Sequence, residues 1–567
     1  MLPVNIDNLS AYLKPPLGYR FDKGFTTTYS LHLDILLTMP MFLDGRLSEE
    51  NAVIENYAGV VAAIKSFKDK FKVYVQKGEI QTSSLASKKA SKLYELLRPM
   101  IQEIHKDTTK SSFHPKLWLL RYESENGKSK KYRLIVLSKN LTNSKDLDIA
   151  VVFDGTIQEE SKHKEINENI FYFCKNILED DTFSEEELKQ VIWDNIDDYS
   201  LENFYVLPKD KNKLPFVSKR KINDKTIVFS PFVSNDVLTE KSILVTREEE
   251  IKEQVCKNMY TINSSLIEKE ELLPQKLEMF EKEKNVSNKV FIHQLHAKIY
   301  VYKKNHKNWL TFGSANATHR GLSKNDEILV ELKAPRGFYE NTKNYIETNK
   351  FFVELEVQDK VDDSQDNSQK ILDELDDIKR KILNLKIKLE YKDEKLVLKS
   401  TMEELEEGIK IEVTPSSRIS FQHFKEKLFW KVEESEITGW FRFRLSKEGE
   451  SREFLFNDED FEIQEDYVKN VEKEASEKSL DYLKANIFAL LNDGNITKSK
   501  MRESIKEDIS DGMHNYCSKR VDTHEYIYDL MLDKYAMNVS EYNTLLGLFK
   551  KVDEYKSLLD VLPKAKV

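Results

Sequence analysis

The stretch HAKIYVYKKNHKNWLTFGSANATHRGL, residues 296–322, decides how the rest of the chain is interpreted. Its apolar, aromatic and β-branched first part is typical of a buried strand. His296 and Lys298 are two residues apart, so both side chains point to the same face of that strand. A Gly-Ser-x-Asn turn follows, with Ser314 and Asn316. Such an arrangement can bind a phosphate, but a charged surface strand followed by an ordinary loop would give the same pattern if it occurred once.

The same succession of residues occurs a second time, earlier in the chain. Each copy contains His-x-Lys, then Ser-x-Asn, then an acid: His114, Lys116, Ser138, Asn140 and Asp148 in the first, and His296, Lys298, Ser314, Asn316 and Glu327 in the second. A third His-x-Lys, from His423 to Lys425, has no Ser-x-Asn behind it and is an accident of composition. The two complete copies indicate an internal repeat, which has to be found before any fold is named.

The repeat predicts a particular chemistry if its copies pack about a pseudo-twofold axis. Both His-x-Lys pairs then meet in one cleft, where two lysines and two asparagine amides surround the non-bridging oxygens of a phosphodiester. One histidine attacks phosphorus, and the other protonates the leaving oxygen. Asp148 and Glu327 can each hold one imidazole through its other nitrogen and so fix its tautomer.

The double motif resembles the signature of the phospholipase D superfamily, which is His-x-Lys followed by Gly-Ser-x-Asn, given twice. The resemblance covers about residues 25–335. It implies a fold with two mixed-sheet α/β half-domains and a covalent phosphohistidine mechanism that needs no metal and no cofactor. It also implies that His114, in the first copy, is the nucleophile.

One feature departs from the family pattern. The family's aspartate, seven residues after the histidine, is Arg121 in the first copy and Lys303 in the second. The same loss is found in the tyrosyl-DNA phosphodiesterase branch and in some restriction-type nucleases. Two more cations are expected to add positive charge to the cleft, which favours nucleic acid over phospholipid as the substrate.

The order of predicted elements supports an α/β fold class with two similar halves. The first half combines strands at 31–43, 71–78, 114–123, 132–140 and 146–155 with helices at 51–67 and 90–105. The second half begins again with strands at 225–233 and 241–247, a helical stretch to about 284, and strands at 291–304, 308–316 and 326–332. This order predicts two phospholipase D-like half-domains related by a pseudo-twofold.

Six regions are expected along the chain. They are the first half (1–158), an acidic connector (159–219), the second half (220–350), a polar linker and helix (351–385), a small β-rich domain (386–465) and an α-helical tail (466–567). Charge divides these regions, because residues 1–350 carry 53 Lys and Arg against 50 Asp and Glu, whereas residues 351–567 carry 35 against 48. A slightly basic catalytic part next to an acidic one is compatible with a polyanionic substrate.

The bulk composition places the chain among cytoplasmic proteins. No apolar run reaches the roughly 18 residues of a membrane helix, and the first residues lack the features of a signal peptide. Three widely spaced cysteines give neither a disulfide framework nor zinc spacing. No membrane partner and no metal or cofactor are expected.

The leading hypothesis is a metal-independent phosphodiesterase that cleaves DNA and serves as the nuclease of a bacterial defence or restriction system. Three alternatives stay open: a DNA-end repair phosphodiesterase that removes adducts, a phospholipase D-type lipid hydrolase, and a non-catalytic DNA-binding subunit. The chain has no motor motif, so a motor ATPase or helicase that feeds DNA to it would have to be a separate partner.

Overall fold

The computed structural model describes residues 12–43, 57–82, 88–142, 146–159, 161–250, 256–263, 294–355, 363–401, 408–433 and 436–461. The chain divides into two compact units, Met1–Leu47 with Ala63–Ile463, and Ser48–Ala62 with Gln464–Val567. All that follows concerns the first unit, except that the helix Tyr57–Phe67 begins in the second unit. The predicted helical tail, 466–567, lies outside the described residues.

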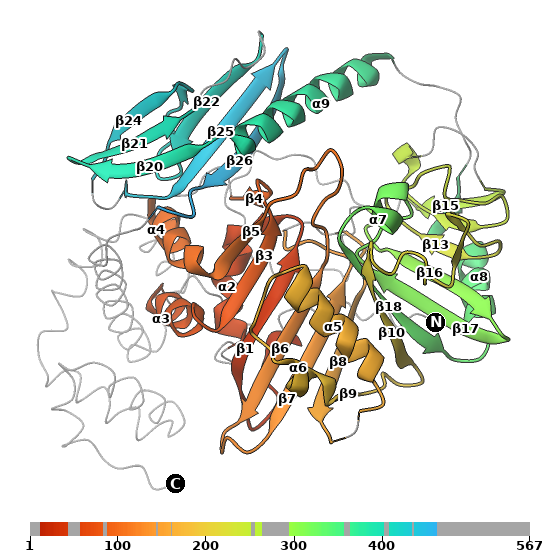
Figure 1. The fold of residues 1–567 in the computed structure, drawn as a ribbon. Coiled ribbons are helices and arrows are strands. Elements are labelled where there is room, and N and C mark those ends of the chain that lie inside the picture. Colours follow the sequence, from red (N-terminus) through yellow and green to blue (C-terminus); the bar gives the residue numbers. More distant parts are fainter. Residues whose placement is uncertain are drawn as a thin grey trace, which may run out of the picture. The chain divides into compact units, whose positions relative to one another are not determined.

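The first half of the repeat is built on a seven-stranded mixed sheet (Figure 1). Its three parallel strands precede an antiparallel set, and the order across the sheet is β5 (Ile101–Ile104), β3 (Phe71–Gln76), β1 (Tyr19–Thr28), β6 (Leu117–Ser124), β7 (Lys130–Leu137), β8 (Ala150–Ile157) and β9 (Val191–Trp193). The helices of this half and its continuation are α2 (Leu33–Leu43), α3 (Tyr57–Phe67), α4 (Lys88–Leu97), α5 (Lys164–Asn176) and α6 (Glu185–Lys189), with a 3-10 turn, η2 (Arg98–Met100).

The second half repeats that sheet with the same order and directions. Its eight strands run β19 (Phe352–Glu354), β15 (Asn258–Ile262), β14 (Ile243–Val245), β13 (Ile227–Phe229), β16 (Ile299–Lys304), β17 (Lys307–Gly313), β18 (Glu327–Ala334) and β10 (Ser200–Leu207). Three of them, β13 to β15, are parallel, and β16, β17 and β18 follow in antiparallel order, as β1, β3, β5 and then β6 to β8 do in the first sheet. The repeat predicted from the motifs is therefore confirmed in the strand order.

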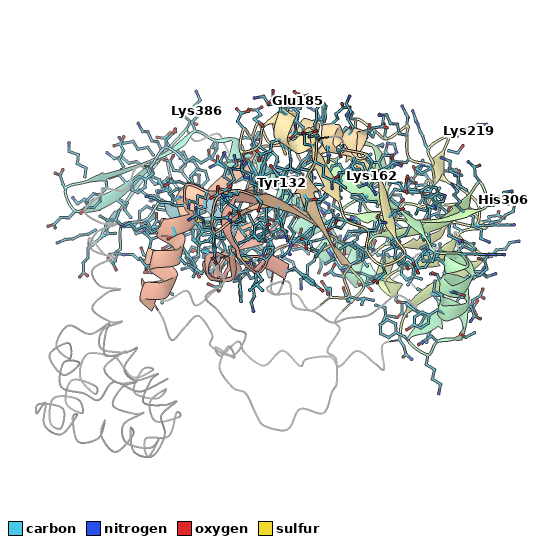
Figure 2. The ribbon with its side chains drawn as sticks, turned by 90° about the horizontal axis from the view of Figure 1, so that it is seen from below. Tyr132, Lys162, Glu185, Lys219, His306 and Lys386 are labelled. Atoms are coloured by element: carbon cyan, nitrogen blue, oxygen red, sulfur yellow. The ribbon has the colours of Figure 1, made fainter. Side chains whose placement is uncertain are left out.

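Smaller elements complete the second half. They are the 3-10 turn η3 (Glu248–Glu250), the helices α7 (His319–Ser323) and α8 (Phe338–Thr348), and the two-stranded pair β11 (Val217–Ser218) with β12 (Lys221–Ile222). The first half has a similar small pair, β2 (Leu31–His32) with β4 (Ile80–Gln81). One apolar core contains side chains from both large sheets and from α5, for example Leu119, Phe173 and Val301. Figure 2 shows Tyr132 inside this packed interior, whereas Lys219, His306 and Lys386 lie at the periphery.

Several predicted elements were wrong, and each has a physical reason. Residues 33–43 form α2 instead of a strand, because its buried side chains recur at the three- and four-residue spacing of a helix: Leu33, Leu36, Met39 and Leu43. The predicted helix 90–105 ends near Pro99, which lacks the backbone N–H that a helix interior needs, and residues 101–104 join the sheet as β5. In the predicted helical stretch up to 284, Asn258–Ile262 is the strand β15.

Two regions contain strands that the sequence analysis did not predict. β1 has a polar sequence, YRFDKGFTTT, yet it is central because its buried threonines are hydrogen bonded. The segment 159–219, expected to be a connector, supplies β9 to the first sheet and β10 to the second. This segment therefore completes one edge of each sheet as well as linking them.

The β-rich domain follows the long helix α9 (Asp363–Asn384), as predicted. It holds a three-stranded sheet, β20 (Ile387–Lys392), β21 (Lys395–Ser400) and β24 (Lys427–Lys431), and a four-stranded sheet, β23 (Gln422–His423), β22 (Lys410–Pro415), β25 (Trp440–Lys447) and β26 (Glu450–Asn457). Arg98 joins this domain to the first half, because its guanidinium donates to the side chain of Asn457 at 3.0 Å and to the carbonyl of Phe461 at 3.0 Å.

Candidate active site

The two predicted histidines meet acids from the opposite copy of the repeat. Nδ1 of His114 lies 3.0 Å from the carboxylate of Glu327, and Nδ1 of His296 lies 3.1 Å from Oδ1 of Asp148. Each half thus orients the histidine of the other half. Neither copy could form this site alone, and the exchange of partners is the relation that a pseudo-twofold axis produces.

Backbone hydrogen bonds hold the same exchange in place. His114 N–H donates to the carbonyl of Asp326 at 3.0 Å, and His296 N–H donates to the carbonyl of Leu147 at 2.9 Å. Parallel β-bridges join Phe113 to Asp326 and Leu147 to Leu295. The residue before each acid is therefore paired with the segment around the opposite histidine, so the backbone as well as the side chains fixes the geometry of the site.

The two predicted lysines have no exposed surface, although most lysines in proteins are largely solvated. Nζ of Lys116 donates to the carbonyl of His114 at 2.9 Å and lies 3.1 Å from its Nδ1. Nζ of Lys298 donates to the carbonyl of His296 at 2.7 Å and to that of Ser138, in the other half, at 3.4 Å. Two buried ammonium groups in one small site are a strong attraction for an anion.

The serines of the Ser-x-Asn turns connect each turn to the strand that carries the acid. Ser138 Oγ accepts from the N–H of Ile149 at 3.0 Å and donates to Asp148 at 2.8 Å. Ser314 Oγ accepts from the N–H of Ile328 at 3.0 Å in the same way. Ser314, which the sequence placed in the site, therefore has a positioning role, and Ser138 is its equivalent.

The asparagines of the turns present amide groups that the protein does not satisfy. Oδ1 of Asn140 and Oδ1 of Asn316 are buried, and neither has a hydrogen-bond partner among the residues that the structure describes. Rotating a side-chain amide exchanges its oxygen and nitrogen, so each asparagine can offer N–H donors to a bound anion. Both amides are therefore suited to binding non-bridging phosphate oxygens.

Two residues that the sequence analysis missed hold these asparagine turns. Thr28, at the end of β1, accepts through Oγ1 from the N–H of Leu141 at 3.0 Å. Ser230, just after β13, accepts through Oγ from the N–H of Ala317 at 2.9 Å. They occupy equivalent places in the two sheets. Aligning the two copies from their first strands would have revealed them, but β1 itself was not predicted.

The glycine of the second turn is required by close packing. A Cβ on Gly313 would lie 2.3 Å from the carbonyl oxygen of Ile328, which real Cβ atoms do not tolerate. The first copy has Leu137 at this place, so only the second turn has the family's glycine. Gly313 therefore allows β17 to approach β18 closely beside Ser314.

Burial and mutual repulsion shift the pKa values of the cations in the site. Burial lowers the pKa of Lys116 to about 7, although the nearby Glu327 and Asp148 oppose that change. Burial, and then the charge of Lys116, lowers the pKa of Lys298 well below its usual value. An anion that binds between the two ammonium groups would reverse both shifts, because it favours their charged forms.

The pKa values of the two histidines differ in their causes. Burial and the charges of Lys116 and Lys298 lower the pKa of His114 well below its usual range, which favours the neutral, nucleophilic imidazole. Burial also lowers the pKa of His296, but the hydrogen bond to Asp148 opposes this and favours the protonated form. Burial raises the pKa of Glu327 to about 8.

Two further residues that were not predicted border the site. The ring centroid of Tyr29 lies 5.1 Å from that of His114. Nε of Arg247 donates to the carbonyl of Leu295 at 2.8 Å, and its charge is one of the influences that lower the pKa of Lys298. Arg247 thus adds a third cation near the two lysines.

Arg121 and Lys303 do not add charge to the site, contrary to the expectation. Arg121 lies along β6 and is bonded to Asp22 at 2.5 Å and to Glu187 at 2.6 Å. Five residues separate it from Lys116, about 16 Å along a strand. Lys303 pairs with Glu340 on the surface. Each of these cations lies five residues beyond the motif lysine on its strand, and each is paired with acids there instead of facing the site.

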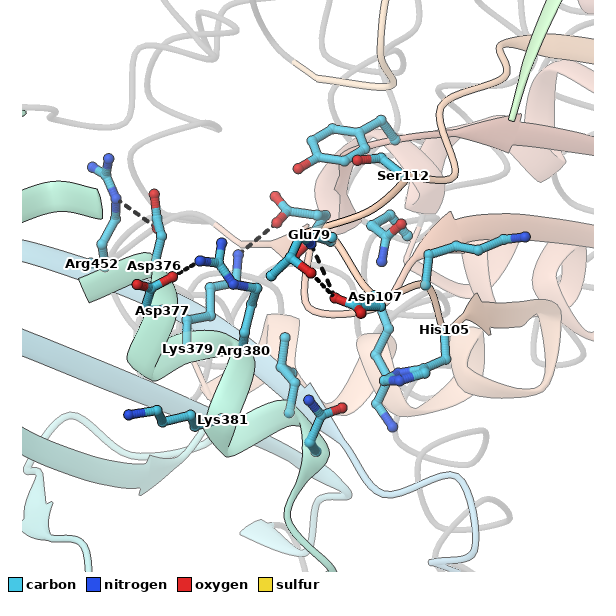
Figure 3. A pocket seen from close by; sticks show the side chains of 18 of the residues that line it. Glu79, His105, Asp107, Ser112, Asp376, Asp377, Lys379, Arg380, Lys381 and Arg452 are labelled. Atoms are coloured by element: carbon cyan, nitrogen blue, oxygen red, sulfur yellow. Dashed lines mark hydrogen bonds and ion pairs between the residues drawn. The ribbon is translucent and has the colours of Figure 1, made fainter. Parts of the chain in front are cut away.

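A polar pocket adjoins the site next to Tyr29. It has a volume of about 870 Å³ and is lined by α9 on one side and by the segment that leads to His114 on the other (Figure 3). Lys379 of α9 bonds Glu79 at 2.7 Å, and Arg452 bonds Asp376 at 3.2 Å. Leu383 is the one aliphatic side chain among the lining residues, so the pocket suits a hydrophilic ligand.

The described residues contain neither a metal-binding cluster nor a membrane-spanning helix. Within the described ranges, no cluster of three or more His, Cys, Asp and Glu side chains has the arrangement of a metal site. None of the helices in those ranges is both long and apolar enough to cross a membrane.

Comparison with known proteins identifies the second copy of the repeat. Residues 239–349, which contain His296, Lys298 and Asn316, match the family model described as "Cardiolipin synthase, PLD-like domain". Residues 239–349 are therefore similar to a phospholipase D-like domain. The first copy lies outside the matched residues, but its sheet has the strand order of the phospholipase D-like half and its motif supplies the other side of the same site.

Solved structures and curated proteins add little beyond this. A mutant of yeast tyrosyl-DNA phosphodiesterase is 12% identical with a TM-score of 0.34, over 55% of this chain and 82% of that chain. Polyphosphate kinase from Porphyromonas gingivalis is 11% identical with a TM-score of 0.32, over 65% of this chain and 51% of that chain. No curated protein matches the chain.

Proposed function

We propose that the phospholipase D-like site is a metal-independent phosphodiesterase that cleaves DNA through a covalent phosphohistidine. One observation carries the proposal: the two His-x-Lys pairs share one buried site, in which each histidine is oriented by an acid of the opposite half. Lys116, Lys298 and the amides of Asn140 and Asn316 surround the place of the phosphoryl group. They supply the positive charge that a pentacoordinate transition state requires.

In the first step, Nε2 of His114 attacks phosphorus, and a P–N bond forms as the P–O bond to the leaving oxygen breaks. His296 gives its proton to that oxygen. In the second step, water attacks phosphorus on the same adduct, His296 takes a proton from this water, and the P–N bond breaks. The low pKa of the His114 imidazole and the hydrogen bond that His296 donates to Asp148 support this division of roles.

The nature of the surroundings supports DNA as the diester. The pocket beside His114 is lined almost entirely by charged and polar residues, including Lys77, Arg320 and Lys379. A lipid diester needs apolar surface for its acyl chains, and this lining offers little of it. The name of the matching family model makes a lipid diester the second candidate.

We also propose a role in a defence or restriction system, with DNA supplied by a separate motor ATPase.

The test is a comparison of substrates in the presence of EDTA. The full chain is incubated with single-stranded DNA, duplex DNA, RNA, oligonucleotides carrying a 3′-tyrosyl adduct, and vesicles containing cardiolipin or phosphatidylcholine. We expect cleavage of DNA, and no headgroup release from vesicles. Headgroup release without DNA cleavage would establish the lipid candidate, preferential release of tyrosine would establish a repair enzyme, and tight DNA binding without any hydrolysis would indicate a binding subunit.

A further inference from the structure

The β-rich domain carries an exposed sheet face that is strongly basic. On the sheet formed by β20, β21 and β24, alternate residues point away from the buried side, and those of the outer face are Lys388, Glu390 and Lys392, then Lys395, Val397 and Lys399, then Lys427, Phe429 and Lys431. All six lysines are exposed. The opposite face is apolar and buried, with Leu389, Leu396 and Trp430 among its residues.

The register places these lysines in two rows across the sheet. Lys388 pairs with Lys399, which pairs with Lys427. We name these three the first lysine row. Lys392, Lys395 and Lys431 form the second lysine row in the same way. Like charges directly opposite each other destabilise a sheet. The chain carries 88 Lys and Arg against 98 Asp and Glu, so a face with six lysines and one acid departs from its average mixture of charges.

An exposed aromatic ring lies between the two rows. Phe429 is 59% exposed, an unusual state for a phenylalanine, and its cross-strand neighbour is Val397. The ammonium group of Lys395 lies 5.5 Å from the centroid of its ring. The two rows are four residues apart along each strand, about 13 Å. The face therefore presents a flat ring with cations on both sides.

On the four-stranded sheet of the same domain, in contrast, acidic side chains neutralise a basic one across the strands. There Arg444 pairs across the strands with Glu412 on one side and Glu453 on the other, and its Nε donates to Glu453 at 2.5 Å. Signs alternate along that row, as is usual when charges stabilise a sheet. Among the described strand residues of the lysine face, the one carboxylate is that of Glu390, which bonds Lys399 at 2.6 Å; Asp393 and Glu394 are exposed in the turn between β20 and β21. One acid leaves most of the positive charge unopposed.

We propose that this face, the two lysine rows with Phe429 between them, binds single-stranded nucleic acid outside the phosphodiesterase site. Bases stack on exposed aromatic rings of a sheet, whereas lysines contact the phosphates in a sequence-independent way. A duplex hides the faces of its bases, so the exposed ring favours a single strand. The choice of nucleic acid over other polyanions also rests on the proposed function, because the site would act on the strand held there.

The experiment measures binding separately from cleavage. Anisotropy of a labelled twenty-residue oligothymidylate is recorded with the full chain carrying His114→Ala, in EDTA, across a salt series. Phe429→Ala should weaken binding about 5- to 150-fold, the loss of one stacked base. Phe429→Trp should restore it. Replacing the first lysine row by glutamine should reduce the slope of log affinity against log salt by about 2, because three phosphate contacts are lost.

A matched control removes the same charge elsewhere. Lys128 is exposed in the turn between β6 and β7, and Lys304 and Lys307 are exposed at the strand ends that flank the turn between β16 and β17. Changing all three to glutamine should leave the affinity and its salt slope nearly unchanged. Equal effects of the two triple variants would overturn the proposal, as would equal effects of Phe429→Ala on a duplex and a single strand. Competition by polyglutamate or anionic vesicles as strong as that by oligothymidylate would also overturn it.

The two proposals can fail independently. Phe429-dependent binding by a chain that cleaves nothing would support the basic face and refute the proposed nuclease. If Phe429→Ala and the glutamine replacement of the first lysine row left binding unchanged while the wild type cleaved DNA, the proposed nuclease would be supported and binding at the basic face would be refuted. Unchanged melting temperatures of the variants check that each of them is folded.

Discussion

Replacing Lys116 by methionine should make the unliganded protein more stable. Lys116 has no exposed surface, and burial lowers its pKa from 10.5 to about 7. Keeping this lysine charged in the folded protein therefore costs about 3 to 5 kcal/mol at pH values below 7. The variant loses the hydrogen bond to the carbonyl of His114, which reduces the gain from removing the buried charge by about 1 kcal/mol. Relaxation of the protein around the charged lysine makes the gain smaller still. We expect a net stabilisation of about 2 kcal/mol from an unbranched side chain of similar length.

The assay is thermal unfolding of the full chain followed by tryptophan fluorescence. For a unit of this size, 2 kcal/mol raises the melting temperature by about 2 °C. Because the folded-state pKa is depressed, the penalty is complete below pH 7 and disappears as the pH rises towards 10.5, so the difference between variant and wild type should shrink over that range. Phosphate or tungstate should stabilise the wild type and should have little effect on the variant.

Lys304→Met is the control, because Lys304 is exposed at the end of β16, and its effect should stay within about 0.5 kcal/mol. A Lys116→Met variant that melts several degrees lower than the wild type would refute the reasoning. It would mean that the ammonium group is fully satisfied by the protein and that the site is not built for an anion.

Three further predictions test other parts of the site. Phosphate affinity, measured by calorimetry in two buffers of different ionisation enthalpy, should fall as the pH rises above 7 and should involve uptake of up to two protons, because a bound anion restores the pKa values of Lys116 and Lys298; binding without proton uptake would contradict this. Asp148→Asn should lower the rate of cleavage about 10- to 100-fold and shift the limb of the pH profile that reports His296, whereas a change in KM alone would refute the pairing. Gly313→Ala should lower the melting temperature, because its Cβ would lie 2.3 Å from the carbonyl of Ile328. Gly127→Ala is the control for backbone strain alone: Gly127 has a φ of +69° but nothing within 4 Å of its Cβ position, so its melting temperature should fall less.

The motifs predicted the candidate site well because their geometry is local. His-x-Lys on a strand fixes a shared face, and the two copies bring His114 to Glu327, His296 to Asp148 and Lys298 to the carbonyl of Ser138. The exchange of Glu327 and Asp148 between the halves could not be read from one copy. It depends on the packing of two sheets about an axis, which is a long-range property.

The failures of the sequence analysis came from segments in which tertiary contacts override local pattern. The strand β1 is held by hydrogen bonds from buried threonines and by the close approach of Gly24 to β6, neither of which gives an apolar periodicity. Leucine-rich residues 33–43 were mistaken for a strand because a short apolar run does not separate helix from strand. The ion pairs of Arg121 were invisible because Asp22 and Glu187 are distant in sequence.

The most direct measurement of the central claim is the identification of the covalent intermediate. The full chain reacts with a labelled oligonucleotide in EDTA, an alkaline quench preserves the acid-labile P–N bond, and peptide mapping locates the label. The account predicts a phospho-adduct on His114, absent from His114→Ala and longer-lived in His296→Ala, because His296 activates the water that releases it. Cleavage that disappears in EDTA, or an adduct on His296 or on any other residue, would contradict the account.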